Sequence, residues 1–284
     1  METTAAQFAS CGGAGIVIDS TRREKRFGPG DQACLYPVLG CGTCEHCGGD
    51  REHMCAKRRL IDLLEPEVRL PDRNCFSIPA NFSSENAATL GSAYLPAWHM
   101  LITLAKLTPG EFVLVHVNGE DTLAALQIAV QMPCHVLAAS FADRALAAAK
   151  ELGAERVFDA RADFVKDLRA ATDKHGVDVA IDCHSGETWM KTLACLARGG
   201  RLVTSGGSAG TQTYTDLQRI FWNHLKIYGS SLGSREDFNH VLRYIQSTGT
   251  RPHIKSVFPW RDLAAAQKLA GEKPLGSIIV RRGM

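Results

Sequence analysis

The sequence predicts an α/β protein in which a doubly wound parallel sheet is joined to a smaller β-rich lobe with a structural zinc loop. Two observations carry this prediction. Apolar, strand-like segments alternate with helical segments between residues 112 and 232, and such alternation is typical of βαβ units with right-handed crossovers. Four cysteines lie close together between residues 41 and 55, within the part of the chain that favours short strands and turns.

The segments predicted as strands of the parallel sheet are short and largely apolar, as expected for strands that are buried on both faces. Helical spacing fills most of the intervals, for example at residues 122–131, 142–153 and 188–200. The predicted strands are residues 112–117, 134–140, 156–160, 177–183, 200–206 and 226–232.

Two further segments connect this pattern to the N-terminal lobe. Residues 14–19 and 33–38 are predicted as strands, separated by a charged turn that contains Gly28, Pro29 and Gly30. Residues 81–105 begin with a Ser-type N-cap and continue with helical spacing, which Gly91 and Pro96 are expected to break. A second domain is therefore expected to begin near Asn81.

The cysteines Cys41, Cys44, Cys47 and Cys55 have the spacing CxxCxxCx7C. This spacing brings four thiolates within reach of one tetrahedral Zn²⁺ and leaves no open coordination position, so the site is predicted to be structural. The alternatives are four ordinary reduced cysteines, or two disulfides in a secreted chain. The glycines within the loop and its polar surroundings favour the metal.

Composition narrows the expected partners. The chain has 32 Lys and Arg against 30 Asp and Glu, a net charge of +2, which gives no electrostatic reason to expect a nucleic acid or a membrane surface. A small-molecule ligand is expected instead. The N-terminus has no pattern of a secretory signal, and no apolar run approaches the ~20 residues that span a bilayer, so a cytoplasmic location is predicted.

The cysteine loop, preceded by FGPGDQACLYP, resembles the structural zinc lobe of the medium-chain dehydrogenase/reductase superfamily, which includes zinc-type alcohol dehydrogenases and quinone reductases. The stretches ENAATLGSAYLPAWHMLITLAKLTPGEFVLVH and GVDVAIDCHSGETWMKTLACLARGGRLVTSGG strengthen the resemblance. It implies a truncated GroES-like β lobe at residues 1–80 and a Rossmann-type cofactor domain at residues 81–245. Residues 246–284 would return to the first lobe, and residues 226–232 would form the edge strand of a homodimer.

The resemblance also shows where the family would hold a catalytic zinc. The second ligand of that zinc falls on Cys11, its acidic neighbour on Gly12, and the third ligand on Ser92. A hydroxyl is a poor zinc ligand beside thiolate and imidazole, so at most Cys11 remains as a good donor. The chain is therefore expected to lack a catalytic zinc.

The glycine-rich turn that the family places after its first Rossmann strand is reduced here to VNGEDT, in which Gly119 is the single glycine. Glu120 and Asp121 follow at the position of the phosphates, where two carboxylates would stabilise their own helix and repel a diphosphate. Two interpretations stay open: a well-capped helix, or a pyrophosphate cradle.

Other positions that the family uses for its dinucleotide are partly kept. Ser140 and Arg144 could contact a 2′-phosphate where a ribose-binding carboxylate is missing, so NADP(H) is favoured over NAD if any dinucleotide binds. Gly206 and Gly207 match a family loop near the nicotinamide, although a plain turn explains them equally well.

Residues 206–210 also satisfy the pattern GxSxG of hydrolase nucleophile elbows. Such an elbow passes from a strand directly into a helix, whereas residues 211–217 are predicted to be extended or turn, which weighs against a hydrolase. His184, at a predicted strand end, is the best candidate for a general acid or base, with a solvated loop histidine as the alternative. No catalytic residue is assigned.

Two functions follow from these features. The first is an atypical oxidoreductase that acts without catalytic zinc, with hydride chemistry supplied by NADP(H). The second is a non-redox family member that serves as a ligand-binding or partner-binding module, since function depends on sites and not on the fold alone.

Overall fold

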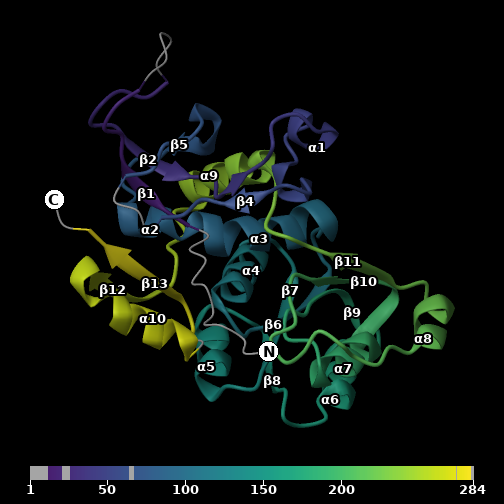
Figure 1. Ribbon diagram of the computed structural model, residues 1–284. Helices are drawn as coiled ribbons and strands as arrows, with labels where there is room; N and C mark the ends of the chain where they lie inside the picture. Colours follow the sequence, from purple (N-terminus) through teal and green to yellow (C-terminus); the bar gives the residue numbers. More distant parts are fainter. Residues whose placement is uncertain (1–11, 21–25, 64–66, 273, 283–284) are drawn as a thin grey trace, which may run out of the picture. The chain divides into compact units, whose positions relative to one another are not determined.

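The protein is described from a computed structural model, which covers residues 12–20, 26–63, 67–272 and 274–282 (Figure 1). The chain divides into two compact units. The first comprises Met1–Ser92 and Ser234–Met284, and the second comprises Ala93–Gly233. The sequence placed the joins after residues 80 and 245, whereas the units divide within a continuous helical run and just before a helix. The two units are described separately below.

The second unit contains the predicted doubly wound parallel sheet. Its strand order is β11-β10-β9-β6-β7-β8, the order of a Rossmann-type sheet, and every neighbouring pair is parallel. The central strands are buried on both faces, which explains their nearly uninterrupted apolar sequence. The strands are β6 (Phe112–His116), β7 (His135–Ser140), β8 (Arg156–Asp159), β9 (Val177–Ile181), β10 (Leu196–Thr204) and β11 (Lys226–Gly229).

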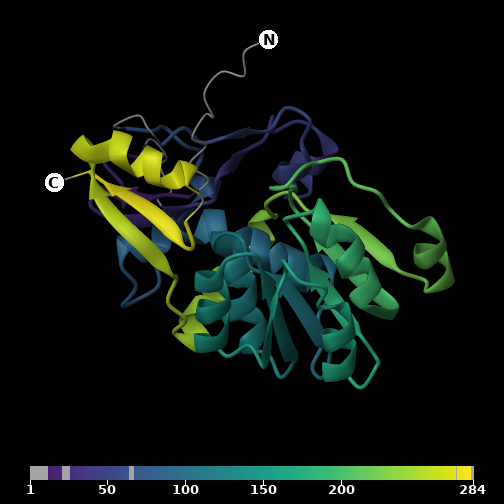
Figure 2. The same ribbon diagram turned by 90° about the horizontal axis from the view of Figure 1, so that it is seen from below.

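Helices connect these strands and cover both faces of the sheet, as Figure 2 shows. Helix α4 packs on β6 and β7, α5 packs on β7 and β8, and α7 packs on β10 and against α6. The sequence did not predict α6. The helices are α4 (Glu120–Val130), α5 (Asp143–Glu151), α6 (Val165–Ala171), α7 (Glu187–Cys195) and α8 (Leu217–Trp222).

The helical run that leads into this unit starts as predicted, because the Ser83 hydroxyl accepts a hydrogen bond from the Asn86 N–H at 3.2 Å and caps α2 (Ser84–Ala88). Where the sequence predicted a break in the helix, the structure has a change of helix type. Two π-helical turns, η3 (Leu90–Tyr94) and η4 (His99–Leu104), flank α3 (Leu95–Trp98). Pro96 lies where α3 directly continues η3, so its missing N–H removes one bond of the helical run at this change of helix type.

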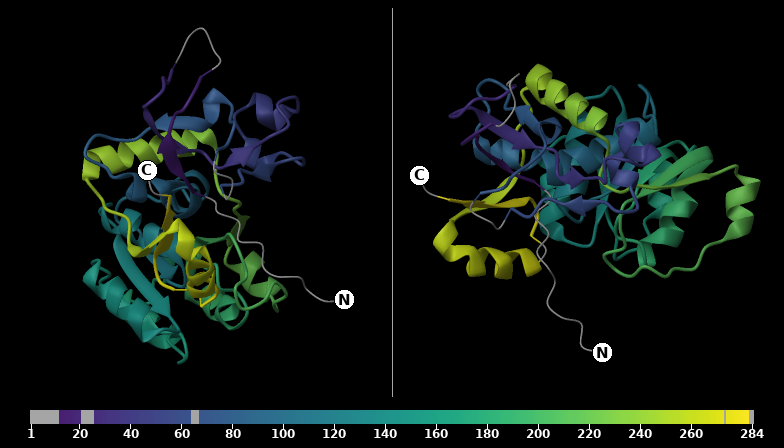
Figure 3. Two further views of the ribbon diagram at one scale, coloured as in Figure 1. Left: turned by 60° about the vertical axis from the view of Figure 1, so that its left-hand side comes forward. Right: turned by 45° about the horizontal axis from the view of Figure 1, so that its top comes forward.

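The first unit is built from short strands. Strands β1 (Ala14–Ile16), β2 (Gln32–Leu35) and β5 (Cys75–Ser77) form an antiparallel sheet, and β3 (Val38–Leu39) pairs with β4 (Arg59–Leu60). Near the C-terminus, β12 (Ile254–Pro259) and β13 (Ser277–Arg281) pair in parallel beside α10 (Leu263–Gly271), as the yellow segment of Figure 3 shows. Three 3-10 turns complete it: η1 (Glu52–Met54), η2 (Asp72–Asn74) and η5 (Trp260–Asp262).

Helix α9 (Arg235–Thr248) belongs to this first unit because of its apolar face. The ring of Phe238 lies 5.0 Å from that of Phe76 and 6.2 Å from that of Tyr36, and Phe238 is fully buried. Both ends of α9 are capped. Ser234 and Asp237 exchange hydrogen bonds at its start, and Gly249 adopts a left-handed conformation, φ 67°, at its end.

An ion-pair cluster joins α9 to the cysteine loop. The Nε atom of Arg235 lies 3.0 Å from an oxygen of Glu52, and its Nη2 atom pairs with Asp50. The Glu52 carboxylate is 2% exposed, so its charge depends on Arg235 and on the more distant Arg73. Removing one partner of such a pair leaves a buried charge without compensation.

None of the helices within the described ranges has both the length and the apolar character needed to cross a bilayer.

We expect replacement of Arg235 by methionine to lower the free energy of unfolding by about 3–5 kcal/mol, because Glu52 then stays buried without its cation. Urea denaturation followed by circular dichroism measures this loss. Arg243→Met, at an exposed position of the same helix, is the matched control and should change stability by less than about 0.5 kcal/mol. Equal stability of the two variants would contradict the proposed role of Arg235.

Candidate functional site

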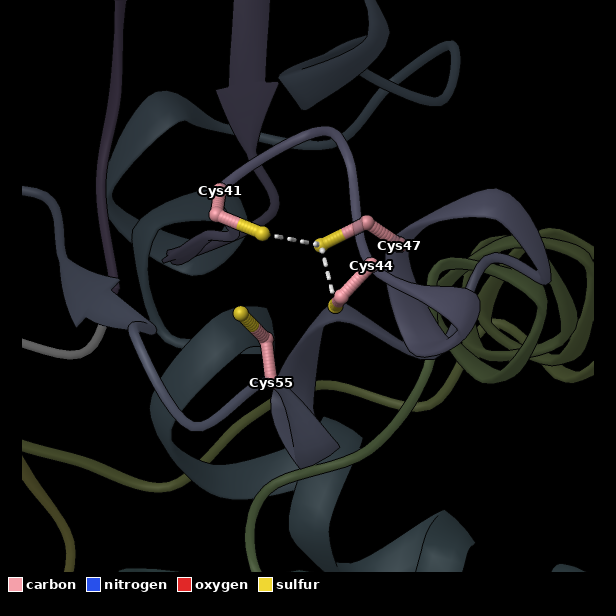
Figure 4. A group of neighbouring side chains, drawn as sticks. All are labelled: Cys41, Cys44, Cys47 and Cys55. Carbon is pink, nitrogen blue, oxygen red and sulfur yellow. Dashed lines mark hydrogen bonds between the residues drawn. The ribbon is translucent and has the colours of Figure 1, made fainter.

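The four cysteines of the zinc motif come together in the first unit. Cys44 immediately precedes the single-turn helix α1 (Glu45–Gly48), which carries Cys47, while Cys55 follows η1. All four sulfur atoms lie within 4.8 Å of one another and point toward a common centre (Figure 4). The four cysteines that the sequence predicted as zinc ligands therefore lie together in the structure, on an irregular loop that contains short helical turns.

The spacing of the sulfur atoms fits zinc. Four sulfurs placed about 2.3 Å from one Zn²⁺ in a tetrahedron lie about 3.8 Å from each other. The Sγ atom of Cys47 lies 3.5 Å from that of Cys44 and 3.9 Å from that of Cys41. Four thiolates leave no position for water or substrate, so the geometry is that of a structural site.

Local hydrogen bonds prepare the loop for a metal. The hydroxyl of Thr43 and nearby backbone N–H groups favour the thiolate of Cys41 and lower its pKa to about 5. Cys47 accepts from the Gly42 N–H, but desolvation and the other cysteines outweigh this bond and raise its pKa to about 11. A divalent cation would keep all four cysteines as thiolates, because metal binding deprotonates thiol ligands.

The position of the family's catalytic zinc is only partly described, since Cys11 lies outside the described residues. The backbone of Gly12 packs so closely on α2 that a Cβ atom there would lie 2.1 Å from the carbonyl oxygen of Ala88. An acidic side chain at residue 12 could not fit. The Ser92 hydroxyl donates to the Thr89 carbonyl at 3.3 Å.

In the second unit, the turn between β6 and α4 forms hydrogen bonds within itself. The Oγ1 atom of Thr122 accepts from the N–H groups of both Asn118 and Gly119, each at 3.0 Å. These are N–H groups that a glycine-rich turn would offer to a phosphate. The hydroxyl of Thr122 therefore takes the place that a phosphate oxygen would occupy.

Asp121 completes this internal arrangement. One carboxylate oxygen accepts from the Thr122 N–H at 2.8 Å, and the other accepts from the Ser205 hydroxyl at 3.5 Å. Desolvation raises the pKa of the Asp121 carboxyl. Gly119 has extended backbone, and a Cβ atom on it would lie 3.1 Å from Asp121. With Glu120 and Asp121 in its first turn, α4 has its own anions at its positive end.

The remaining predicted cofactor residues lie along the same carboxyl edge. Ser140 is buried, donates to the Val117 carbonyl at 2.7 Å and accepts from the Ala142 N–H at 3.2 Å, so its hydroxyl is used within the fold. Arg144 lies exposed on α5, whose first residue, Asp143, pairs with Arg161.

Gly206 and Gly207 lie in the loop that follows β10. A Cβ atom on Gly207 would lie 2.6 Å from the carbonyl oxygen of Gly210, so this turn requires glycine, whereas Gly206 has more space around it. The loop does not enter a helix, because β10 ends at Thr204 and α8 begins only at Leu217. The prediction that residues 211–217 do not form the helix of a nucleophile elbow is confirmed.

A pocket of about 710 Å³ opens at this edge. Two of its walls are the rings of Phe141 and His184, whose centroids are 4.6 Å apart. A planar ring inserted between them would have to push them apart. The lining residues are Phe141, His184, Gly186, Glu187, Met190, Ala209, Gln212, Thr213 and Tyr214.

A buried carboxylate holds the end of β9 beside this pocket. Asp182 accepts from the backbone N–H groups of His184 and Ser185 and from the hydroxyls of Thr188 and Thr192, all within 3.0 Å. Burial disfavours its charge, but nearby His116 and these hydrogen bonds outweigh burial and keep its pKa below the ordinary value.

The Thr192 hydroxyl also contacts Nε2 of His116 at 2.8 Å. Burial lowers the pKa of His116, although the charge of Asp182 opposes this shift, and the imidazole takes part in a structural network. Sequence reasoning had not singled out Asn118, Thr122 or Asp182 as site residues. The signal for Thr122 was a hydroxyl in the first turn of a helix that lacks a Ser or Asp N-cap.

We expect the purified chain to contain about one zinc ion per molecule, and Cys44→Ser to lose nearly all of it, because three thiolates without the fourth hold zinc weakly. Elemental analysis measures both. Cys134→Ser, at a cysteine outside the cluster, should keep the metal. Two zinc ions per chain would indicate a second metal site, and none in the unaltered chain would show the motif to be misread.

Known proteins show the same combination of features. The sequence model of the family described as "Zinc-binding dehydrogenase" matches residues 122–247. A curated relative, one of the phenolphthiocerol/phthiocerol polyketide synthase proteins of Mycobacterium tuberculosis, is 37% identical over 217 residues, which is 72% of this chain and 10% of that protein. A mycocerosic acid synthase-like polyketide synthase of the same organism is 28% identical over 243 residues, 84% of this chain and 11% of the relative. The chain thus spans about a tenth of the length of these relatives.

Among solved structures, an NAD-dependent alcohol dehydrogenase superposes with a TM-score of 0.90 at 27% identity, covering 96% of this chain and 82% of the other. A structure described as AibC superposes with a TM-score of 0.86 at 26% identity, covering 95% and 78%. Together with the parallel sheet and the four-cysteine loop, these matches identify the fold and the metal lobe. The chain belongs to the zinc-binding dehydrogenases of the medium-chain dehydrogenase/reductase superfamily.

Proposed function

We propose that this dehydrogenase/reductase-type protein acts without a catalytic zinc and that NADP(H), rather than NAD, is its dinucleotide. The packing of Gly12 carries the first part of the proposal. Its backbone lies against Ala88, which leaves no room for the acidic neighbour of the family's second ligand, and Ser92 offers only a hydroxyl at the third position. No Lewis acid would then polarise the substrate oxygen.

The end of β7 supports the choice of NADP(H). A carboxylate at this position would bind the ribose diol of NAD, but the chain has Ser140 there, buried and bonded to Val117. Arg144, exposed on α5, supplies positive charge nearby. NADP(H) would contribute the hydride, and the protein would contribute the pocket and its walls.

The turn between β6 and α4 does not fit a pyrophosphate as it stands. Thr122 already accepts from both N–H groups of the turn, and the carboxylate of Asp121 would repel a diphosphate. This observation favours a second candidate function, in which the protein binds a small molecule in the pocket beside His184 and transfers no hydride. The two candidates differ in whether a dinucleotide binds at all.

Calorimetric titration with NADPH, NADP, NADH and NAD distinguishes the candidates. If Thr122 and Asp121 limit binding, Asp121→Asn combined with Thr122→Val should raise NADPH affinity by about tenfold or more, which corresponds to about 1.4 kcal/mol. Both replacements keep the side-chain shape while they remove the charge and the acceptor. Asp167→Asn, an exposed aspartate of α6, is the control for the change in net charge.

Micromolar binding of NADPH would justify a screen of carbonyl and enone substrates. If neither the unaltered chain nor the double variant binds any of the four dinucleotides, the second candidate stands and hydride transfer is excluded.

We further propose that the protein is a homodimer that pairs through β11. This strand forms one edge of the sheet, and Ile227 on it is half-exposed. Beside it α8 exposes Leu217, Phe221 and Trp222, each by more than half of its surface. An open sheet edge next to exposed apolar side chains favours association with a second copy that offers the same edge.

We expect sedimentation analysis at micromolar concentration to give the mass of two chains, and Leu217→Glu combined with Trp222→Glu to give the mass of one. Val257→Glu, which places one glutamate at a 46% exposed valine in the first unit, should leave the mass unchanged. A monomeric unaltered chain would refute the proposed dimer.

A further inference from the structure

Three polar side chains meet at the carboxyl edge of the sheet in a group that neither the zinc lobe nor the proposed reductase function uses. The Oγ atom of Ser208 lies 3.1 Å from Nδ1 of His184 and accepts a hydrogen bond from Nδ2 of Asn118 at 3.0 Å. Ser208 is exposed, and His184 and Asn118 are half-buried. The serine hydroxyl can therefore donate to the imidazole while an amide donor points at the same oxygen.

Neighbouring bonds set the orientation of Asn118. Its Oδ1 atom accepts from the Thr122 hydroxyl at 3.2 Å, which leaves Nδ2 directed toward Ser208. In the opposite amide orientation Oδ1 would face Ser208 and accept from its hydroxyl, so the observed orientation is the one that leaves this hydroxyl free to donate to His184. In this orientation Asn118 is a hydrogen-bond donor to the serine oxygen.

His184 is held in an equally defined way. Its backbone N–H donates to buried Asp182 at 3.0 Å, and its ring packs on Phe141 with centroids 4.6 Å apart. A nucleophile within hydrogen-bond reach of a base, with that base positioned by its surroundings, is the arrangement that activates a serine hydroxyl.

We propose that Ser208 is a nucleophile that accepts acyl groups from activated esters, with His184 as its general base and Asn118 as the hydrogen-bond donor that positions the serine oxygen. In the first step the Oγ–acyl carbon bond forms and the bond between that carbon and the leaving-group oxygen breaks. The serine proton passes to Nδ1 of His184 and from there to the leaving oxygen, so an alcohol or phenol departs and His184 is neutral again. A phenol as acidic as p-nitrophenol then ionises in water to its phenolate. Water, deprotonated by His184, then releases the carboxylic acid and restores the serine.

The adjoining pocket defines the class of ester. His184 and Ala209, the residue after Ser208, both belong to its lining, which also contains the apolar side chains of Phe141, Met190 and Tyr214. Glu187 in the lining would repel anionic acyl groups. The pocket therefore fits neutral esters with an aryl or short alkyl group.

This site differs from a hydrolase elbow in a way that limits its rate. The N–H groups of Ser208 and Ala209 donate to the carbonyl groups of Cys183 and His184, at 3.2 and 2.9 Å, so they are used within the loop. These N–H groups therefore do not form an oxyanion hole, and the side chain of Asn118 donates to the serine oxygen itself. Acylation is therefore best detected as a covalent product.

The experiment uses the purified, zinc-loaded full chain with p-nitrophenyl acetate. We expect a burst of p-nitrophenolate equivalent to about one acyl group per chain and an acetyl group on Ser208 in the peptide mass spectrum. Ser208→Ala should abolish both. His184→Gln should slow the burst by about 100-fold, as expected when a general base is lost. Asn118→Ala should slow it by about tenfold, because the serine oxygen loses the donor that positions it.

Ser247→Ala, an exposed serine at the end of α9, is the matched control and should react as the unaltered chain does. Zinc content and circular dichroism show that each variant is folded. An unchanged burst in Ser208→Ala, or acetyl groups spread over lysines without enrichment at Ser208, would overturn the proposal. The result does not depend on dinucleotide binding, so it is separate from the test of the proposed function.

Discussion

The carboxyl edge of the sheet depends on one buried carboxylate. Asp182 directly follows β9 and accepts four hydrogen bonds, two from backbone N–H groups and two from threonine hydroxyls of α7. Because a buried carboxylate is tolerated only when its oxygens are satisfied, these bonds fix the path of the chain from β9 into α7. His184, the wall of the pocket and the partner of Ser208, takes its position from this turn.

The turn after β6 shows how a phosphate site can be satisfied from within the protein. In a glycine-rich turn, the N–H groups at the start of the helix are left for a ligand, and the missing side chains let the ligand approach. Here Thr122 and Asp121 supply the oxygens that a ligand would supply. The gain is a stable helix start, and the cost is the loss of a free anion site.

Sequence patterns predicted the strands and the metal loop well because both depend on local features. Apolar runs of five or six residues identify buried parallel strands. The spacing of Cys41, Cys44, Cys47 and Cys55 identifies these cysteines as the ligands of one metal ion. Helix α9 was not predicted, since its assignment depends on Phe238 meeting distant Tyr36 and Phe76.

Contacts between residues that are far apart in the sequence also escaped prediction elsewhere in the chain. The pairing of Glu52 with Arg235 joins residues that are far apart in the sequence, so no short pattern reveals it. The change to π-helical turns around Pro96 also escaped the sequence, because a helix break and a change of helix type produce the same glycine and proline signals. Contacts at long sequence separation are the part that required the structure.

The roles of Thr122 and Asn118 connect the two chemistries of the second unit. The Thr122 hydroxyl accepts hydrogen bonds from the N–H groups of the turn. It also donates to Oδ1 of Asn118, and this bond orients the amide of Asn118 toward Ser208. A diphosphate that displaced Thr122 from these N–H groups would also release the amide of Asn118. The closed turn therefore favours the serine site, and an open turn would favour a dinucleotide, so the two ligands should compete through a single side chain.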